Sequence, residues 1–160
     1  MSAYVRPAVV ADLRGLQPRE RIDPARLAPW LNQLGPGSAL VLHTGWSHHY
    51  GTSAYWDHPV LDEAAARAVV ERGVRLVAVD APSVDETLLG AAGPGLEVHR
   101  VLARVGAVVV ENLTALEQVD FPDPLLSVLP LRLTGADGAP CRAVALELLP
   151  GPADAPDVRA

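Results

Sequence analysis

Two side chains of this sequence, His99 and Glu111, have the types and the spacing to bind a metal ion. His99 lies in Leu96–Arg104, whose pattern predicts a short helix, and Glu111 follows Ala107–Val110, which is typical of a buried strand. A helix followed by a strand could bring the imidazole and the carboxylate together, and both groups bind divalent ions. They supply only part of a site, because a catalytic zinc ion normally has about three protein ligands.

Glu111 needs a partner wherever it lies at the end of an apolar strand. A buried, unpaired carboxylate carries a desolvation cost of several kcal/mol. We expect either a bound cation or an arginine, Arg100 or Arg104, to offset it. On periodicity alone, His99 is a surface or packing residue.

Polar residues also follow two other stretches that we predict to be strands. His43–Trp46 follow one of them, and Asp80, Ser83 and Asp85 follow or end the other. Because ligands of open α/β sheets bind outside the carboxyl ends of the strands, we expect a crevice lined by these groups. Asp80 and Ser83 could instead cap the turn after their strand, and we interpret Asp85 as a solvated loop acid.

An aromatic and polar stretch, Ser47–Pro59, predicts a loop beside this crevice. Its aromatic side chains, together with Trp46, could face an aromatic substrate or anchor a subunit interface, where such residues are enriched. We interpret His43, His48 and His58 as structural or pocket-lining residues and not as metal ligands. The predicted substrate pocket comprises Trp46, Tyr55, Trp56, His58, Asp80 and Ser83.

Composition excludes several classes of protein. The chain has 160 residues and a net charge of −6, which argues against a nucleic-acid partner because phosphates require a basic face. No apolar run approaches the roughly 18 residues of a membrane helix, and we recognise no signal peptide. The single cysteine, Cys141, forms no intrachain disulfide, and we expect it to be a small buried hydrophobic residue. We expect a cytoplasmic protein.

The remaining pattern predicts the α/β class, with a mixed sheet that has a parallel portion and a C-terminal antiparallel hairpin around the turn Gly135–Pro140. We expect one domain over residues 1–150 and a frayed tail at 151–160, with a small connector at Gly90–Gly95. Asp23 and Pro24 predict a helix start. The other predicted helices are Leu61–Arg72 and Leu96–Arg104. The predicted strands are Pro7–Leu13, Ala39–His43, Val74–Asp80, Ala107–Val110, Leu125–Leu133 and Arg142–Leu148.

Several segments resemble the cyclase family of metal-dependent hydrolases, which includes bacterial kynurenine formamidase and isatin hydrolase. They are Leu42–Trp46, Tyr55–Leu61, Gly73–Asp85, His99–Leu102, Val110–Leu113 and the C-terminal hairpin. The resemblance runs in order from about Val9 to Leu148. It implies a compact domain of swivelling β/β/α type that assembles as a homo-oligomer, either a dimer or a tetramer.

The resemblance also implies one or two divalent metal ions, zinc or manganese. In the family, a later His and Glu complete a site whose other ligands come from the pattern His-x-Gly-Thr-His-x-Asp-x-Pro-x-His, and His99 and Glu111 match that later pair. The pattern itself is absent from this sequence. His49–Tyr55 keeps its first His, Gly and Thr, but Ser53 and Tyr55 replace the second His and the Asp, so we interpret this segment as a chance similarity.

The activity implied by the resemblance is hydrolysis of a small-molecule amide or formamide, as by an arylformamidase of tryptophan catabolism, with N-formylkynurenine as the leading substrate. The catalytic acid or base would come from the absent pattern, so no catalytic residue is assigned. We expect this polypeptide to bind metal weakly and to hydrolyse its substrate poorly.

Three explanations remain for the absent pattern. The chain could start at an internal methionine of a longer protein, which we favour. A second chain could supply the missing ligands at an interface. Alternatively, the chain could be a non-catalytic relative that acts as a binding or scaffold subunit.

Overall fold

The structure is a computed structural model that describes residues 3–88 and 95–148. Its centre is a six-stranded mixed sheet with the strand order β6-β5-β3-β1-β7-β8. The first four of these strands are parallel, and β7 and β8 run antiparallel to their neighbours. The strands are β1 (Val5–Asp12), β3 (Ala39–His43), β5 (Leu76–Val79), β6 (Val108–Val110), β7 (Leu125–Pro130) and β8 (Cys141–Leu146).

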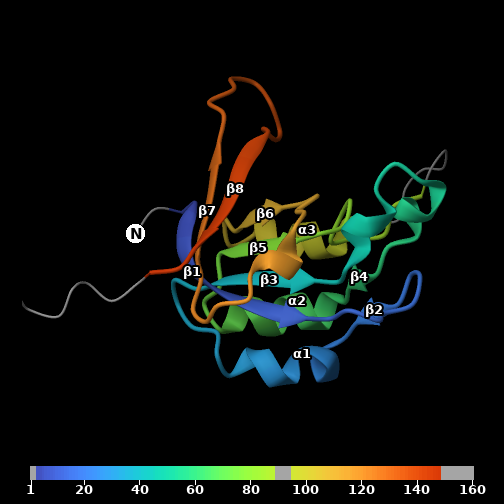
Figure 1. Cartoon of the computed structure of the whole chain (residues 1–160), viewed down its shortest axis with the longest axis horizontal. Helices are drawn as coiled ribbons and strands as arrows, with labels where there is room; N and C mark the ends of the chain where they lie inside the picture. Colours follow the sequence, from blue (N-terminus) through green and yellow to red (C-terminus); the bar gives the residue numbers. More distant parts are fainter. Residues whose placement is uncertain (1–2, 89–94, 149–160) are drawn as a thin grey trace, which may run out of the picture.

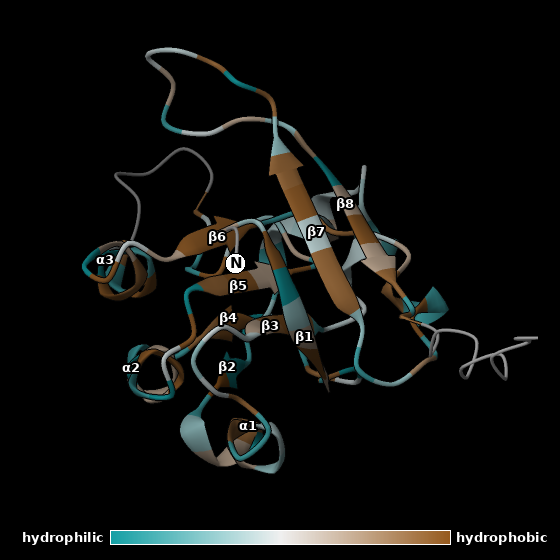
Figure 2. Cartoon of the chain, turned by 90° about the vertical axis from the view of Figure 1, so that its left-hand side faces the viewer, coloured by the Kyte–Doolittle hydropathy of each residue, from teal (hydrophilic) through white to brown (hydrophobic). Residues whose placement is uncertain are grey.

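Three helices lie on the same side of this sheet (Figure 2). They are α1 (Pro24–Leu31), α2 (Glu63–Glu71) and α3 (Glu97–Ala103). A small parallel pair of strands, β2 (Arg21–Ile22) and β4 (Val60–Leu61), lies outside the main sheet. The segment predicted as a loop, residues 47–59, contains most of two 3-10 helices, η1 (Trp46–His49) and η2 (Ser53–Asp57), and a third, η3 (Leu116–Gln118), precedes β7.

The central strands are buried on both faces, which explains their almost continuous apolar sequence. Successive side chains of a strand point to opposite faces. Leu40 and Leu42 of β3 therefore pack in the core under the helices, whereas Ala39 and Val41 belong to a second core on the other face. That second core is closed by Leu116 and by residues of β7.

Local sequence signals set the starts of two helices. Asp23 caps α1 by accepting a hydrogen bond from the Arg26 amide at 2.8 Å, with Pro24 at the first helical position. Asp62 caps α2 by accepting from the Ala64 amide at 2.8 Å. The third helix, α3, has no side-chain cap from its own N-cap residue, Leu96.

The predicted fold class is confirmed, including the mixed sheet and the C-terminal hairpin of β7 and β8, which projects from the rest of the chain (Figure 1). Two burial predictions are wrong. Val108 and Val109 are only partly buried because β6 is an edge strand, and Cys141 is exposed because β8 forms the other edge. The predicted connector at residues 90–94 and the tail at 151–160 lie outside the described residues.

Asp80 joins the carboxyl ends of β3 and β5. Its carboxylate is fully buried and accepts hydrogen bonds from the Thr44 amide (2.9 Å), the Thr44 hydroxyl (2.6 Å) and the Gly45 amide (2.7 Å). Gly45 has a φ of 78°, which an L side chain rarely adopts. The carboxylate therefore holds a tight turn directly after β3 against the end of β5.

We expect Asp80→Ala to lower the free energy of unfolding by about 2–4 kcal/mol, because it leaves three donors without their acceptor in the interior. Urea denaturation followed by circular dichroism measures this change. Asp137→Ala, in the exposed loop between β7 and β8, is the control and should change stability by less than about 0.5 kcal/mol. Equal stability of the two variants would contradict the role of the Asp80 carboxylate.

Candidate functional site

Three side chains form a line at the carboxyl ends of β5 and β6. The Nδ1 atom of His99 lies 2.7 Å from Oδ2 of Asp85, and the Nε2 atom of His99 lies 3.4 Å from Oε1 of Glu111. The Asp85 side chain is almost fully buried at 6% exposure, whereas those of His99 and Glu111 are 32% and 28% exposed. The imidazole thus lies between two carboxylates and is partly exposed to solvent.

Asp85 positions His99 through the backbone as well as through the ring. Its carboxylate accepts hydrogen bonds from the amides of Val98 and His99, both at 2.9 Å, in the first turn of α3. It therefore caps α3 from the loop after β5, which satisfies amides that the helix itself cannot pair. The interpretation of Asp85 as a solvated loop acid is wrong, because these donors compensate its burial.

Backbone hydrogen bonds of the residues after Glu111, and one to its carboxylate, fix the position of Glu111. The amide of Asn112 donates to the Ala81 carbonyl at 2.9 Å, and the Leu113 amide donates to the Val79 carbonyl at 3.0 Å. The Val84 amide donates to Oε1 of Glu111 at 3.3 Å. In the described part of the chain, the ionic partner of Glu111 is His99. The sequence-based alternative, a pair with Arg100 or Arg104, is therefore wrong for these residues.

The two carboxylates raise the pKa of His99 from its ordinary value to about 9. The hydrogen bond to Asp85 is the largest cause and Glu111 is the next, and together they outweigh partial desolvation. For Asp85, burial is the largest single influence and raises the pKa, but the hydrogen bonds from the His99 ring and from the two amides outweigh it, so the pKa is lowered. The metal-free site therefore holds an imidazolium between two carboxylates near neutral pH.

The donor atoms fit a divalent ion as part of a ligand set. Metal-binding histidines commonly donate one ring N–H to a carboxylate, which orients the other nitrogen toward the metal. Asp85 occupies Nδ1 in this way, so Nε2 is the nitrogen that faces Glu111. Within residues 3–88 and 95–148, no group of three or more His, Cys, Asp or Glu side chains could hold a metal ion. His99 and Glu111 thus fit as two ligands of an ion that needs others.

One predicted pocket residue connects directly to this site. The Tyr55 hydroxyl donates to Oδ1 of Asn112 at 2.8 Å, next to Glu111, and the Tyr55 carbonyl accepts from the Trp46 indole at 3.1 Å. Burial is the main cause that raises the pKa of Tyr55 to about 12, so its hydroxyl stays protonated. This contact ties the aromatic segment after β3 to the chain beyond β6.

The other predicted pocket residues make contacts within the protein. His58 is buried, with Nδ1 bonded to the Pro59 carbonyl (2.9 Å) and Nε2 bonded to the Thr87 hydroxyl (3.1 Å). Ser83 accepts from the Asp85 amide at 3.2 Å, and Asp80 holds the turn after β3. Trp56 is 38% exposed. Their contact with a substrate stays a prediction.

Sequence reasoning missed two residues of this site, Asp85 as the partner of His99 and Asn112 as the partner of Tyr55. Asp85 lies 14 residues from His99, with no local pattern that links them. Asn112 follows Glu111 directly and has a φ of 61°, which is uncommon for a residue other than glycine. The sequence signal available for Asn112 was its position as a polar residue directly after the candidate ligand Glu111.

Comparison with known proteins places this chain in a family. The Cyclase family model matches residues 1–86. The chain belongs to the cyclase family. It is 42% identical to a kynurenine formamidase of Bacillus cereus over 145 residues, which are 90% of this chain and 64% of that relative. A kynurenine formamidase of Delftia acidovorans is 41% identical over 93 residues, 56% of this chain and 41% of that relative. The chain thus spans less than two thirds of the length of these relatives.

Several solved structures share the fold of this chain. An isatin hydrolase bound to the product analogue thioisatinate superposes with a TM-score of 0.78 at 19% identity, over 89% of this chain and 60% of that one. A potential metal-dependent hydrolase with cyclase activity superposes with a TM-score of 0.73 at 24% identity, over 92% and 68%. The described helices of this chain are all too short or too polar to cross a membrane.

We expect His99 to stabilise the fold in a pH-dependent way. An imidazole in the unfolded chain has a pKa of about 6.5, and that of folded His99 is about 9. The stabilisation is therefore complete below about pH 6.5 and is lost as the pH rises through 9. The difference in unfolding free energy between the wild type and His99→Gln, measured in urea, should shrink over this interval.

His49→Gln replaces an exposed histidine that contacts neither Asp85 nor Glu111, and it is the control. Nuclear magnetic resonance of the ring protons reports the same titration directly. Asp85→Asn should lower the midpoint of His99, because it removes the carboxylate whose hydrogen bond contributes most to the raised pKa. A midpoint at the ordinary value in the wild type would contradict the assignment.

Proposed function

We propose that this cyclase-family chain supplies His99 and Glu111 as two ligands of a divalent metal ion in a hydrolase that acts on an amide or formamide. The observation that carries this proposal is the line of Asp85, His99 and Glu111, in which a buried carboxylate orients the imidazole toward a second carboxylate. The relatives named kynurenine formamidase support hydrolysis of a formamide.

A bound divalent ion would supply Lewis acidity, lowering the pKa of a water molecule and polarising the carbonyl of the substrate. The residues of the chain prepare that chemistry. Asp85 keeps the proton of His99 on Nδ1, so that Nε2 presents its lone pair once the ring is neutral. The Val84 amide fixes Oε1 of Glu111, and Tyr55 fixes Asn112 beside it.

The substrate class that we propose is an amide, formamide or lactam on an aromatic amine, with N-formylkynurenine first, as in tryptophan catabolism. Names of relatives support this choice, because kynurenine formamidases and an isatin hydrolase are among them. The aromatic segment around Trp46 and Tyr55 lies next to the site through the contact with Asn112. It is suited to contact an aromatic ring.

The second candidate function is a non-catalytic binding or scaffold subunit. One observation favours it: in the described residues, His99 and Glu111 find no third metal-binding side chain. A hydrolase needs further ligands from a longer polypeptide or from another chain.

We also propose that the protein is a cytoplasmic homo-oligomer. Leu129, Leu131 and Leu133 at the hairpin are exposed, and this apolar surface supports burial against another subunit.

We expect the chain to bind zinc or manganese weakly, with both ligands required. Truncating either ligand, in His99→Ala or Glu111→Ala, should weaken binding by at least about 10-fold, because each removes one of two donors. Asp85→Asn should weaken it by about 10–100-fold through the orientation of the ring. Equilibrium dialysis of the purified 160-residue chain measures these affinities.

Matched controls are His49→Ala and Glu97→Ala, an exposed imidazole and an exposed carboxylate outside the line. Equal metal content in the wild type and His99→Ala would remove the ligand assignment. Hydrolysis of N-formylkynurenine is measured on the same samples. Metal binding that depends on His99 and Glu111 without any turnover would favour the non-catalytic alternative.

A further inference from the structure

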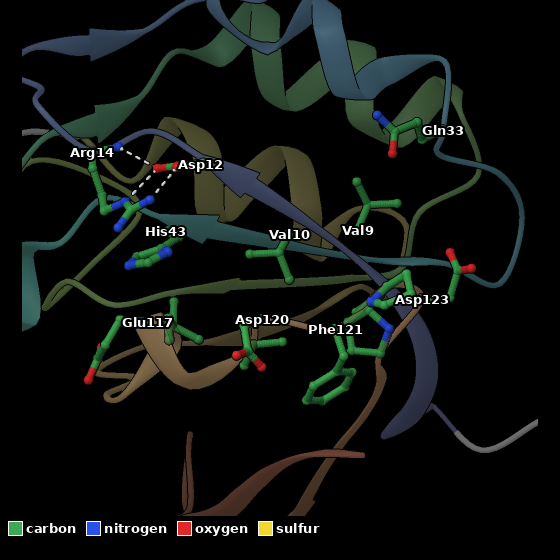
Figure 3. A pocket seen from close by; sticks show the side chains of 15 residues that line it. Val9, Val10, Asp12, Arg14, Gln33, His43, Glu117, Asp120, Phe121 and Asp123 are labelled. Carbon is green, nitrogen blue, oxygen red and sulfur yellow. Dashed lines mark hydrogen bonds and ion pairs between the residues drawn. The ribbon is translucent and has the colours of Figure 1, made fainter. Parts of the chain in front are cut away.

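The Tyr55 side chain is buried, and its hydroxyl reaches a turn in a distant part of the sequence. The side chain belongs to a residue that is 4% exposed, and the hydroxyl donates to Oδ1 of Asn112 at 2.8 Å, across 57 residues of sequence. Tyr55 is not among the residues that line the cavity of about 530 Å³ beside β1 (Figure 3). Its hydroxyl therefore serves a contact inside the protein, although the sequence predicts Tyr55 in the substrate pocket.

Asn112 forms the turn that directly follows Glu111. Its φ of 61° lies in the left-handed region, which asparagine tolerates better than most residues with a side chain. Its amide donates to the Ala81 carbonyl at 2.9 Å, so the chain is fastened here to the loop after β5. A backbone in this region persists only where the surrounding structure holds it. The Tyr55 hydroxyl supplies that contact to the Asn112 side chain.

Tyr55 is itself held at several points. Its ring packs edge-on against Tyr50, with the centroids 5.4 Å apart and 79° between the ring planes. Its carbonyl accepts from the Trp46 indole at 3.1 Å, and the Trp46 amide donates to the Thr44 hydroxyl at 3.1 Å. That hydroxyl donates to the buried Asp80 carboxylate at 2.6 Å. A continuous series of hydrogen bonds therefore supports Tyr55 from the end of β5.

The turn at Asn112 determines where the Glu111 carboxylate lies. The two residues share a planar peptide bond, so a rotation at Asn112 moves the backbone of Glu111. The carboxylate meets two groups at once, the Val84 amide at 3.3 Å and Nε2 of His99 at 3.4 Å. Both distances are long for hydrogen bonds, so a small displacement of the carboxylate would break them.

We propose that Tyr55 is a positioning residue for Glu111. Its hydroxyl holds Asn112 in the left-handed turn, and that turn sets the Glu111 carboxylate within reach of Nε2 of His99. The consequence for metal binding rests on the proposed function of Glu111 as a ligand, whereas the consequence for the position of Glu111 does not. Tyr55 acts through Asn112 and contacts neither the metal ion nor the substrate.

Tyr55→Phe tests the proposal, because it removes the hydroxyl and keeps the ring. In the 160-residue chain labelled with nitrogen-15, the Val84 amide reports the position of the Glu111 carboxylate without any metal. We expect the proton resonance of this amide to move upfield in Tyr55→Phe, as in Glu111→Ala, because it loses its acceptor. The Ala64 amide, bonded to the Asp62 carboxylate at the start of α2, should stay in place in both variants.

Equilibrium dialysis with manganese measures the consequence for metal binding. Tyr55→Phe should weaken binding by at least about 5-fold, somewhat less than the loss of a residue that bonds a ligand directly. Tyr50→Phe, which removes the hydroxyl of a 74% exposed tyrosine, is the matched control and should bind manganese like the wild type. Asn112→Gly removes the acceptor and suits the positive φ. In that background, Tyr55→Phe should weaken binding by no more than about 2-fold further.

Three results would overturn the proposal. The first is a Val84 resonance that Tyr55→Phe leaves in place. The second is a full further loss of affinity from Tyr55→Phe in the Asn112→Gly background, because Tyr55 would then not act through Asn112. The third is equal manganese affinity of Tyr55→Phe and the wild type while Glu111→Ala binds more weakly, a result that leaves the ligand role of Glu111 intact.

Failure of the proposed function gives a different pattern. A wild type that binds no manganese contradicts the ligand role of Glu111, and the Val84 resonance still decides the role of Tyr55. If Tyr55→Phe does not fold, Asn112→Gly breaks the same hydrogen bond from the acceptor side. An unmoved Val84 resonance in that variant would then overturn the proposal.

Discussion

The candidate site depends on the hydrogen bonds that the Asp85 carboxylate accepts. This carboxylate is buried, and it accepts from two amides of α3 and from the ring of His99. A carboxylate in this position is stable only while all these donors stay in place, because its desolvation must be offset. The helix start, the ring orientation and the loop after β5 are therefore coupled. Displacing any one of them would leave a buried charge or an unpaired amide.

Other buried polar groups near the carboxyl ends of the parallel strands are also held by hydrogen bonds. Asp80 holds the turn after β3, His58 bonds at both ring nitrogens, and Tyr55 reaches Asn112 beyond β6. No fully buried side-chain nitrogen or oxygen in the described chain lacks a partner. Such satisfied networks define one arrangement of the loops. They place the imidazole of His99 and the carboxylate of Glu111 within 3.4 Å of each other.

The sheet separates two regions of different chemistry. At one end, beside β5 and β6, lie Asp85, His99 and Glu111, where the imidazole is paired with both carboxylates. Beside β1, where parallel pairing gives way to the antiparallel hairpin, Asp12 is paired with Arg14, whereas Glu117, Asp120 and Asp123 have no ion pair with any described residue. In our proposal, the first region contributes His99 and Glu111 as ligands of a divalent ion.

The sequence by itself determined the element types, the sheet class and the pair of candidate ligands. Apolar runs such as Ala39–His43, the cap at Asp23 and the turn before β8 act locally, so they can be recognised without coordinates. Only the tertiary structure decided the partners of those ligands and the exposure of edge residues such as Cys141. Asp85 meets His99 across a loop, and β7 leaves β1 after three paired residues. Such contacts depend on how distant segments pack, and no local pattern of residue types encodes that packing.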